Sequence, residues 1–323
     1  ASLAELSPED EARKGLVFMQ KQDFASACEV FSALQAAHPG DPALRFNYAW
    51  SLAMGKDFDG ALQLLDSATS QALPQAAALQ VELMHNQGLF LEAGELARSL
   101  IERHPNHSGL LAAASVLAID NEDLDAAVDY ARRAGDHPDA LTTLGVLALD
   151  TDRGGEAASL FARALEQKST SPRAWIGSGL SRMLSGDHAA AAHDLTHGAE
   201  IFATHVGSWI GAGFAHLLAG DLAKARLMFE RALALDHNFA ESHGSLAVID
   251  VLEGNIADAR RGAETARRLD GASFSAALAS ALIASADQRP ELAQMIIEKA
   301  LHTPIDQNGR TIAQSLARLG LSN

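Results

Sequence analysis

Cysteine and aromatic residues are scarce in this chain of 323 residues, which contains a single cysteine, Cys28, and 5% aromatic residues. A lone cysteine cannot form an internal disulfide, and no second cysteine is available to share a metal ion with it. We therefore expect a buried or half-buried thiol without a chemical role. Hydrophobic residues still make up 48% of the chain, so its interior must be built from alanine and leucine.

Basic residues are also in short supply. The chain has 25 Lys and Arg against 41 Asp and Glu, a formal charge of −16, and no run of five basic residues. Phosphate backbones and anionic lipids repel such a chain, so we expect no nucleic-acid partner. No apolar run reaches transmembrane length, so we expect no membrane insertion. We expect a cytoplasmic protein, or a periplasmic one if a leader was removed before Ala1.

The sequence does contain a repeat, marked by alanines that recur every 30 to 34 residues. Twelve residues before each alanine stands a residue that is nearly always small, and four residues after it stands Phe, Leu or Ala. Such a period predicts a stack of helix hairpins. The alanines are Ala27, Ala61, Ala93, Ala127, Ala157, Ala191, Ala225 and Ala259.

Each repeat reads as a helix A, a short turn and a helix B, with the alanine in helix B facing the small residue in helix A. A single hairpin leaves one face exposed, and stacking on its neighbours buries that face. The predicted turns are rich in Gly, Asp and Asn, such as Gly186-Asp187 and Gly254-Asn255. Glycine tolerates the positive φ of a helix end, and Asp or Asn caps the helix that follows.

This pattern resembles the tetratricopeptide repeat family, whose motif is Trp-x2-Leu-Gly-x2-Tyr, then Ala-x3-Phe, then Pro. The best matches are Trp175, Gly179 and Ala191, then Trp209, Gly213, Ala225 and Phe229; the first repeat contributes Gly15, Ala27, Phe31 and Pro39. The resemblance implies an all-α, right-handed superhelical solenoid of about eight to nine hairpins.

We expect one such solenoid over residues 1–323, closed by a capping helix over residues 308–319. The family's proline is missing at Leu73, Ser169, Ala203 and His237, which leaves the loop geometry there open. The spacing from Ala127 to Ala157 is only 30 residues, so we expect an irregular junction near 135–138 rather than a domain boundary. The expected repeats are 8–41, 42–73, 74–107, 108–137, 138–171, 172–205, 206–239, 240–273 and a degenerate 274–304.

The resemblance also implies a concave groove lined by the A helices, which would bind a protein or peptide. The matching positions are apolar at both ends and acidic in the middle. The Lys, Asn and Arg with which co-chaperone members of the family clamp a carboxylate are absent, apart from Asn47. The predicted groove residues are Leu16, Met19, Phe46, Trp50, Met54, Glu82, His85, Val116, Asp120, Val146, Asp150, Ile176, Leu180, Met183, Ile210, Phe214 and Leu217.

Three equivalent positions carry polar residues instead of the family's aromatic residue. Arg182, His216 and Asp250 stand in successive repeats, so stacking would bring them into a polar ladder. An inter-repeat salt-bridge chain is the simpler interpretation, and a polar anchor at one end of the groove is the functional one. Neither a nucleophile nor an oxyanion arrangement accompanies them, so we predict no catalysis.

Two other patterns could carry chemistry. Gly177-Ser178-Gly179 has the spacing of a phosphate loop, but it recurs as Gly211-Ala212-Gly213 one repeat later and therefore indicates packing within helix A. His193 and His197, four residues apart, could place two imidazoles on a metal ion, although a solvated helix face is the simpler interpretation. The same holds for His104 and His107. We expect no cofactor and no physiological metal.

The leading prediction is a non-enzymatic scaffold that binds an apolar peptide or an amphipathic helix. One alternative is a chaperone or assembly factor for a bacterial secretion or pilus system. Another is the recognition arm of a larger enzyme. Self-association through an exposed repeat end is a further expectation, because such an end can stack on its twin.

Overall fold

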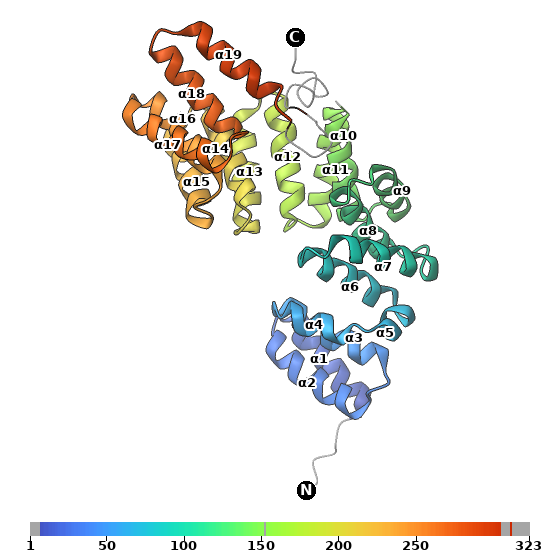
Figure 1. The fold of residues 1–323 in the computed structure, drawn as a ribbon. Coiled ribbons are helices and arrows are strands. Elements are labelled where there is room, and N and C mark those ends of the chain that lie inside the picture. Colours follow the sequence, from blue (N-terminus) through green and yellow to red (C-terminus); the bar gives the residue numbers. More distant parts are fainter. Residues whose placement is uncertain (1–6, 152, 305–310, 312–323) are drawn as a thin grey trace. The chain divides into compact units, whose positions relative to one another are not determined.

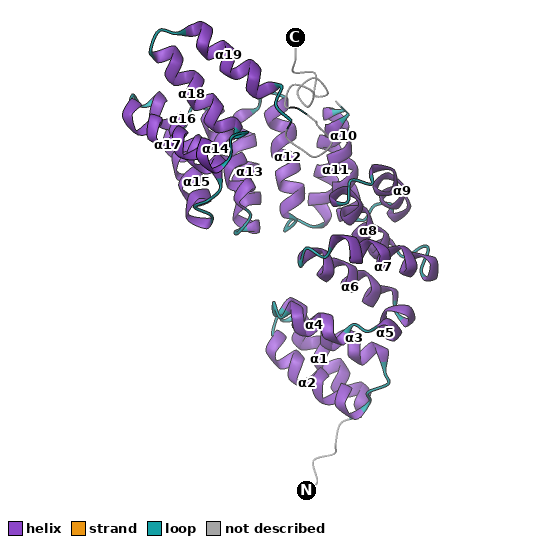
Figure 2. Cartoon of the chain, in the orientation of Figure 1, coloured by secondary structure: helices purple, strands orange, loops and turns teal. Residues whose placement is uncertain are grey.

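A computed structural model describes residues 7–151, 153–304 and Thr311, and every regular element within them is an α-helix. Short loops join the helices (Figure 2). The predicted capping helix, 308–319, lies outside the described residues apart from Thr311. The helices are α1 (Pro8–Gln20), α2 (Phe24–Ala37), α3 (Pro42–Met54), α4 (Phe58–Leu64), α5 (Ser67–Ala72), α6 (Pro74–Asn86), α7 (Phe90–Arg103), α8 (Ser108–Asp120), α9 (Leu124–Ala134), α10 (Pro138–Asp150), α11 (Gly154–Gln167), α12 (Pro172–Leu184), α13 (His188–Phe202), α14 (Val206–Leu218), α15 (Leu222–Leu235), α16 (Ala240–Leu252), α17 (Ile256–Leu269), α18 (Phe274–Ala286) and α19 (Pro290–Leu301).

The chain divides into two compact units, Ala1–Thr143 and Leu144–Asn323, with the division inside α10. Figure 1 follows both units from α1 in blue to α19 in red. Just before this helix, α9 ends at Ala134 and Gly135 takes a φ of 68°, so the chain turns sharply at the short spacing of the repeat. The single solenoid and the repeat boundaries stay predictions. No helix in the described part of the chain is long and apolar enough to cross a membrane.

The repeat alanines form the centre of the packing. We call the helices that carry them B helices and the helices before them A helices. All eight alanines, from Ala27 to Ala259, have no exposed surface. In the four A helices where the small residue is glycine, it makes room mainly for the side chain four residues after the alanine, not for the alanine itself. A methyl group added to Gly15 would lie 2.7 Å from the ring of Phe31, and one added to Gly145 would lie 2.7 Å from the ring of Phe161.

The turns between A and B helices share one geometry. In seven of the eight repeats the residue five positions before the repeat alanine has a positive φ, as in Lys56 at 70° and Gly186 at 84°; the eighth, Asp152, lies outside the described residues. Asp residues then cap five of the eight B helices, and the Asp187 carboxylate accepts a hydrogen bond from the Ala190 N–H. These predictions are confirmed, with one exception: Asn255 makes no side-chain cap on α17.

The second repeat departs from the expected single B helix. Here α4 ends at Leu64, and a separate short helix, α5, begins at Ser67. The Asp66 carboxylate accepts hydrogen bonds from the backbone N–H and the hydroxyl of Thr69, and it also pairs with Arg45 of α3. Capping by Asp66 competes with continuation of the helix, because the capping residue must leave the helical conformation.

In the loops that precede four A helices, a backbone carbonyl accepts a hydrogen bond from a side-chain N–H group. In each case the donor lies six residues after the acceptor, so the same contact recurs through the chain. It also explains how loops without the family's proline are held. The pairs are Arg45 with Pro39 O at 2.7 Å, Trp175 with Ser169 O at 2.7 Å, Trp209 with Ala203 O at 2.9 Å and His243 with His237 O at 2.8 Å.

Candidate functional site

The predicted groove positions in the first unit hold large apolar side chains that remain open to solvent. On α3, Trp50 is 39% exposed and Met54 is 48% exposed, while Leu16 on α1 is 40% exposed. Phe46 stacks on Trp50 with ring centroids 5.9 Å apart and the planes inclined by 18°. Two stacked aromatic rings with one face in solvent form a rigid apolar platform.

Half-buried side chains pack beneath the platform formed by Phe46 and Trp50, between it and the core. Phe46 packs against the cluster of buried residues that joins α3, α4 and α6. Met19 lies half-buried against the core beneath α1 and α2, and its sulfur accepts a hydrogen bond from the Ser51 hydroxyl at 3.0 Å. This contact connects α1 to α3. The half-buried Phe46 therefore supports Trp50 without covering it.

The acidic positions of the first unit lie on α6 and α8. Glu82 and Asp120 are exposed, and the Asp120 carboxylate lies 2.5 Å from Nε2 of His85, a contact that links the two helices. The His85 ring also packs against Phe90, with centroids 5.4 Å apart. Val116, on the same helix as Asp120, is half-buried. Part of the predicted acidic centre is thus internally paired.

In the second unit the predicted groove residues belong more to the core than to the surface. Most of them, namely Ile176, Leu180, Met183, Ile210, Phe214 and Leu217, are half-buried against clusters of buried residues. Phe214 makes an edge contact with the fully buried Phe229, with centroids 5.2 Å apart. Val146 and Asp150, on α10, are half-buried. A single trough through both units stays a prediction.

The predicted polar ladder does not form. Arg182, His216 and Asp250 make no contact with one another, and each instead contacts a B helix. Arg182 pairs with Asp194 at 2.8 Å, and His216 lies 3.0 Å from the Thr196 hydroxyl; Asp250 pairs with Arg226 at 2.6 Å. Packed helix axes lie about 8–10 Å apart, so a side chain on the intervening B helix is closer than the next A helix.

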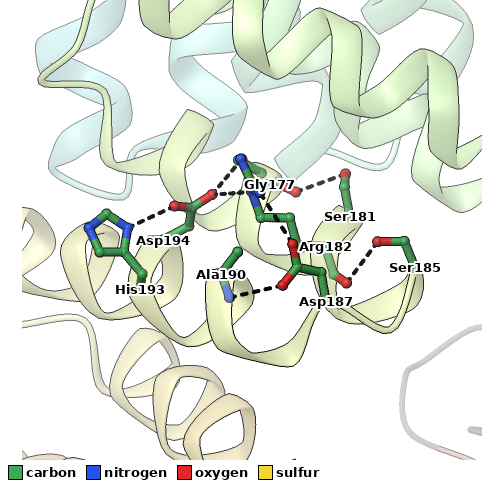
Figure 3. A network of polar contacts seen from close by, with 9 residues as sticks. Gly177, Ser181, Arg182, Ser185, Asp187, Ala190, His193 and Asp194 are labelled. Carbon is green, nitrogen blue, oxygen red and sulfur yellow. Dashed lines mark hydrogen bonds and ion pairs between the residues drawn. The ribbon is translucent and has the colours of Figure 1, made fainter. Parts of the chain in front are cut away.

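Asp194 is the centre of a polar network that the sequence did not single out (Figure 3). Its buried carboxylate accepts a hydrogen bond from the Ser178 hydroxyl at 2.7 Å, in addition to the Arg182 pair. The ring of His193 contacts its other oxygen at 3.0 Å. A buried carboxylate needs such partners. The network therefore ties α12 to α13 and provides a structural role for Arg182.

The histidines considered as metal ligands have other neighbours. His197 packs edge-on against Trp175, with centroids 4.7 Å apart, and His193 lies 6.5 Å from His197. His104 contacts the Ser70 carbonyl at 3.0 Å, while His107 caps α8 by accepting the Leu110 N–H. Within the described residues, no group of three or more His, Cys, Asp or Glu is arranged to hold a metal ion.

Eight titratable groups among the described residues have shifted pKa values, and none belongs to the exposed platform on α3. Burial lowers the pKa of His107, and the neighbouring His104 lowers it further. Burial also lowers the pKa of His216, which Asp221 partly opposes. Burial raises the pKa of the half-buried Cys28 thiol, and Asp57 adds to the effect. The hydrogen bond to Asp250 raises the pKa of Arg226.

Both glycine pairs lie inside A helices and make packing contacts. A methyl group on Gly179 would lie 2.5 Å from Leu195, and one on Gly213 would overlap the ring of Phe229. Their backbone N–H groups belong to the interior of α12 and α14, where they form helical hydrogen bonds. The packing interpretation therefore fits these glycines, and a phosphate loop does not.

Comparison with known proteins agrees with this geometry. The family model described as tetratricopeptide repeat matches residues 13–77 and 142–196. No curated protein sequence matches the chain. The solved structure of a monomeric IFIT1 mutant with Gppp-AAAA is similar in fold, with a TM-score of 0.59 at 11% identity, covering 88% of this chain and 79% of IFIT1.

Two further solved structures are similar at lower TM-scores. A tetratricopeptide repeat protein from Parabacteroides merdae ATCC 43184 has a TM-score of 0.44 at 16% identity, covering 91% of this chain and 98% of that one. MamA has a TM-score of 0.40 at 17% identity, covering 49% of this chain and 92% of MamA.

Proposed function

Because this chain is a tetratricopeptide repeat protein, we propose that it binds an apolar peptide or an amphipathic helix of a partner protein on its A helices. The fold supports a protein–protein interaction scaffold, and no catalytic family is indicated. Side chains at the family's groove positions supply the contact surface. The partner would gain its affinity by burying apolar side chains against them.

The observation that supports this function best is the platform on α3. Large apolar side chains scattered singly on a surface need no explanation, but here Phe46, Trp50 and Met54 lie along one face of a single helix. Aromatic residues and Met are enriched where proteins bind proteins. Truncation of a central Trp typically costs more than about 2 kcal/mol of binding free energy when that residue is an energetic centre of the interface.

The test is capture of the natural partner by the purified chain and by variants. Trp50→Ala should abolish capture, because it removes the exposed ring. Met54→Ala should weaken it. Phe214→Ala is a poorer test, because Phe214 packs on the buried Phe229 and its loss opens a cavity.

Leu227→Ala is the matched control, since Leu227 is 45% exposed on the B helix α15 and lies outside the predicted groove. Circular dichroism should show unchanged helical content in all exposed-site variants. If Trp50→Ala retains capture while its helical content is unchanged, the proposed function is wrong for α3. If Leu227→Ala abolishes capture, the contact lies on the B helices instead.

A further inference from the structure

The exposed apolar surface on α3 lies in the unit that carries most of the charge. We call Phe46, Trp50 and Met54 the Trp50 surface. Residues 1–143 contain 21 Asp and Glu against nine Lys and Arg, a formal charge of −12. Residues 144–323 contain 20 against 16, a formal charge of −4. The excess negative charge is thus concentrated on the unit with the open platform.

Close to the surface the charge is mainly but not only negative, since Lys56, two residues after Met54, is exposed. Among α3, α6 and α8, the only Lys or Arg is Arg45. Its guanidinium is engaged by the Pro39 carbonyl and by Asp66, so it is not available to a ligand in its present position. The other charged residues of these three helices are Glu82 and Asp120, both acidic. Asp57 and Asp59, at the start of α4, are exposed as well.

An apolar platform within a negative field selects its partner in two ways. The platform requires large apolar side chains on one face of the ligand, and the field attracts positive charge and repels negative charge. A second copy of this chain is a poor occupant, since its own Trp50 surface would arrive on a unit of charge −12. The exposed acidic side chains would likewise be repelled by an anionic membrane.

We infer that the Trp50 surface binds a cationic amphipathic helix of a partner protein, an inference that rests on the proposed function. Such a helix would present Leu, Phe or Met at positions i, i+3 or i+4, and i+7 toward Phe46, Trp50 and Met54. Lys and Arg on its flanks would face the acidic side chains of α4 and α6. The charge pairs would speed association and add specificity, and the apolar contacts would supply most of the affinity.

The experiment is a selection from a displayed library of random peptides about 16 residues long, or roughly four helical turns, on the full chain. Peptides with an apolar stripe and several Lys or Arg should be enriched. Synthetic versions of them should bind the chain less tightly as the salt concentration rises. Met54→Lys should weaken their binding by at least about tenfold, because it places a positive charge on the contact surface.

Met295→Lys is the matched control, since Met295 is 59% exposed on α19 of the other unit. The selected peptides should bind this variant with the same affinity as they bind the native chain. Neutral or acidic apolar peptides whose binding is lost in Met54→Lys would overturn the cationic ligand but leave the proposed function intact. If cationic peptides bind Met54→Lys with the same affinity as the native chain, the Trp50 surface is not where they bind.

Two further outcomes would show that the Trp50 surface binds a second copy of the chain, or no ligand at all, instead of a cationic helix. A dimer of the native chain that Met54→Lys dissociates in gel filtration would overturn the inference in favour of a second copy. Enrichment of no peptide at all, together with unchanged capture of the natural partner by Trp50→Ala, would remove both the inference and the proposed function on α3.

Discussion

Close packing in the second unit predicts opposite effects for two glycines of one helix. Gly213 lies in α14 against the fully buried ring of Phe229. A methyl group there would lie 2.8 Å from Cζ of Phe229 and closer still to two other ring atoms. Gly211, two residues earlier in α14, has room, because a methyl group would lie 3.9 Å from Leu195.

The magnitudes follow from two competing effects. Replacing glycine by alanine inside a helix stabilises the folded state by about 1 kcal/mol, because alanine has the better helix propensity. Forcing an extra methyl group into a close-packed site costs about 1–3 kcal/mol. We therefore expect Gly211→Ala to stabilise the chain by up to about 1 kcal/mol, and Gly213→Ala to destabilise it by up to about 2 kcal/mol.

The assay is urea unfolding followed by circular dichroism, with the slope of the transition checked to be unchanged. In the Gly213→Ala background, Phe229→Leu should cost less stability than it does in the native chain, because a smaller side chain relieves the overlap. A Gly213→Ala variant that is at least as stable as Gly211→Ala would refute the packing account of these glycines.

Two further predictions concern the loops before the A helices. Trp209→Phe keeps a ring but removes the hydrogen bond to the Ala203 carbonyl, so it should lower the free energy of unfolding by about 1 kcal/mol; an unchanged urea midpoint would contradict the loop contact. His107 has a lowered pKa in the folded state, so the unfolded chain binds the proton more readily and stability should fall as the pH falls through about 6.5. His107→Asn should keep the cap and reduce this pH dependence between about pH 7.5 and 5.5, and an unchanged slope in urea titrations would show that other groups cause it.

Much of the fold could be predicted because the repeat alanines are a strong periodic signal. Ala27 and its counterparts are fully buried where two helices pack together, so the spacing alone indicates the hairpins. The positive φ values at Gly186, Gly220 and Gly254 were equally predictable, because glycine is the residue that such turns favour. The loop contacts of Trp209 were not, since the accepting group is a backbone carbonyl and leaves no mark in the sequence.

The candidate site could be predicted only in part. Equivalent positions in the repeat identify Trp50 and Phe214 alike, yet one is open and the other packs on Phe229. That difference depends on what the neighbouring B helix places beneath each residue, which the repeat pattern does not specify. The predicted polar ladder was wrong at Arg182 for the same reason. Arg182 pairs with the buried Asp194, whereas the equivalent residue of the next repeat is Met228, so the repeat pattern does not indicate this partner.

The location of the ligand can be measured directly through the methionine methyl groups of the chain. Met54 lies exposed on the Trp50 surface and Met19 lies half-buried on the neighbouring α1, whereas Met183, Met228 and Met295 belong to the second unit. We predict that titration with a cationic amphipathic peptide from the selection shifts the carbon-13 methyl resonance of Met54 most strongly and leaves that of Met295 unchanged. A stationary Met54 resonance, with shifts confined to Met183 or Met295, would contradict the account.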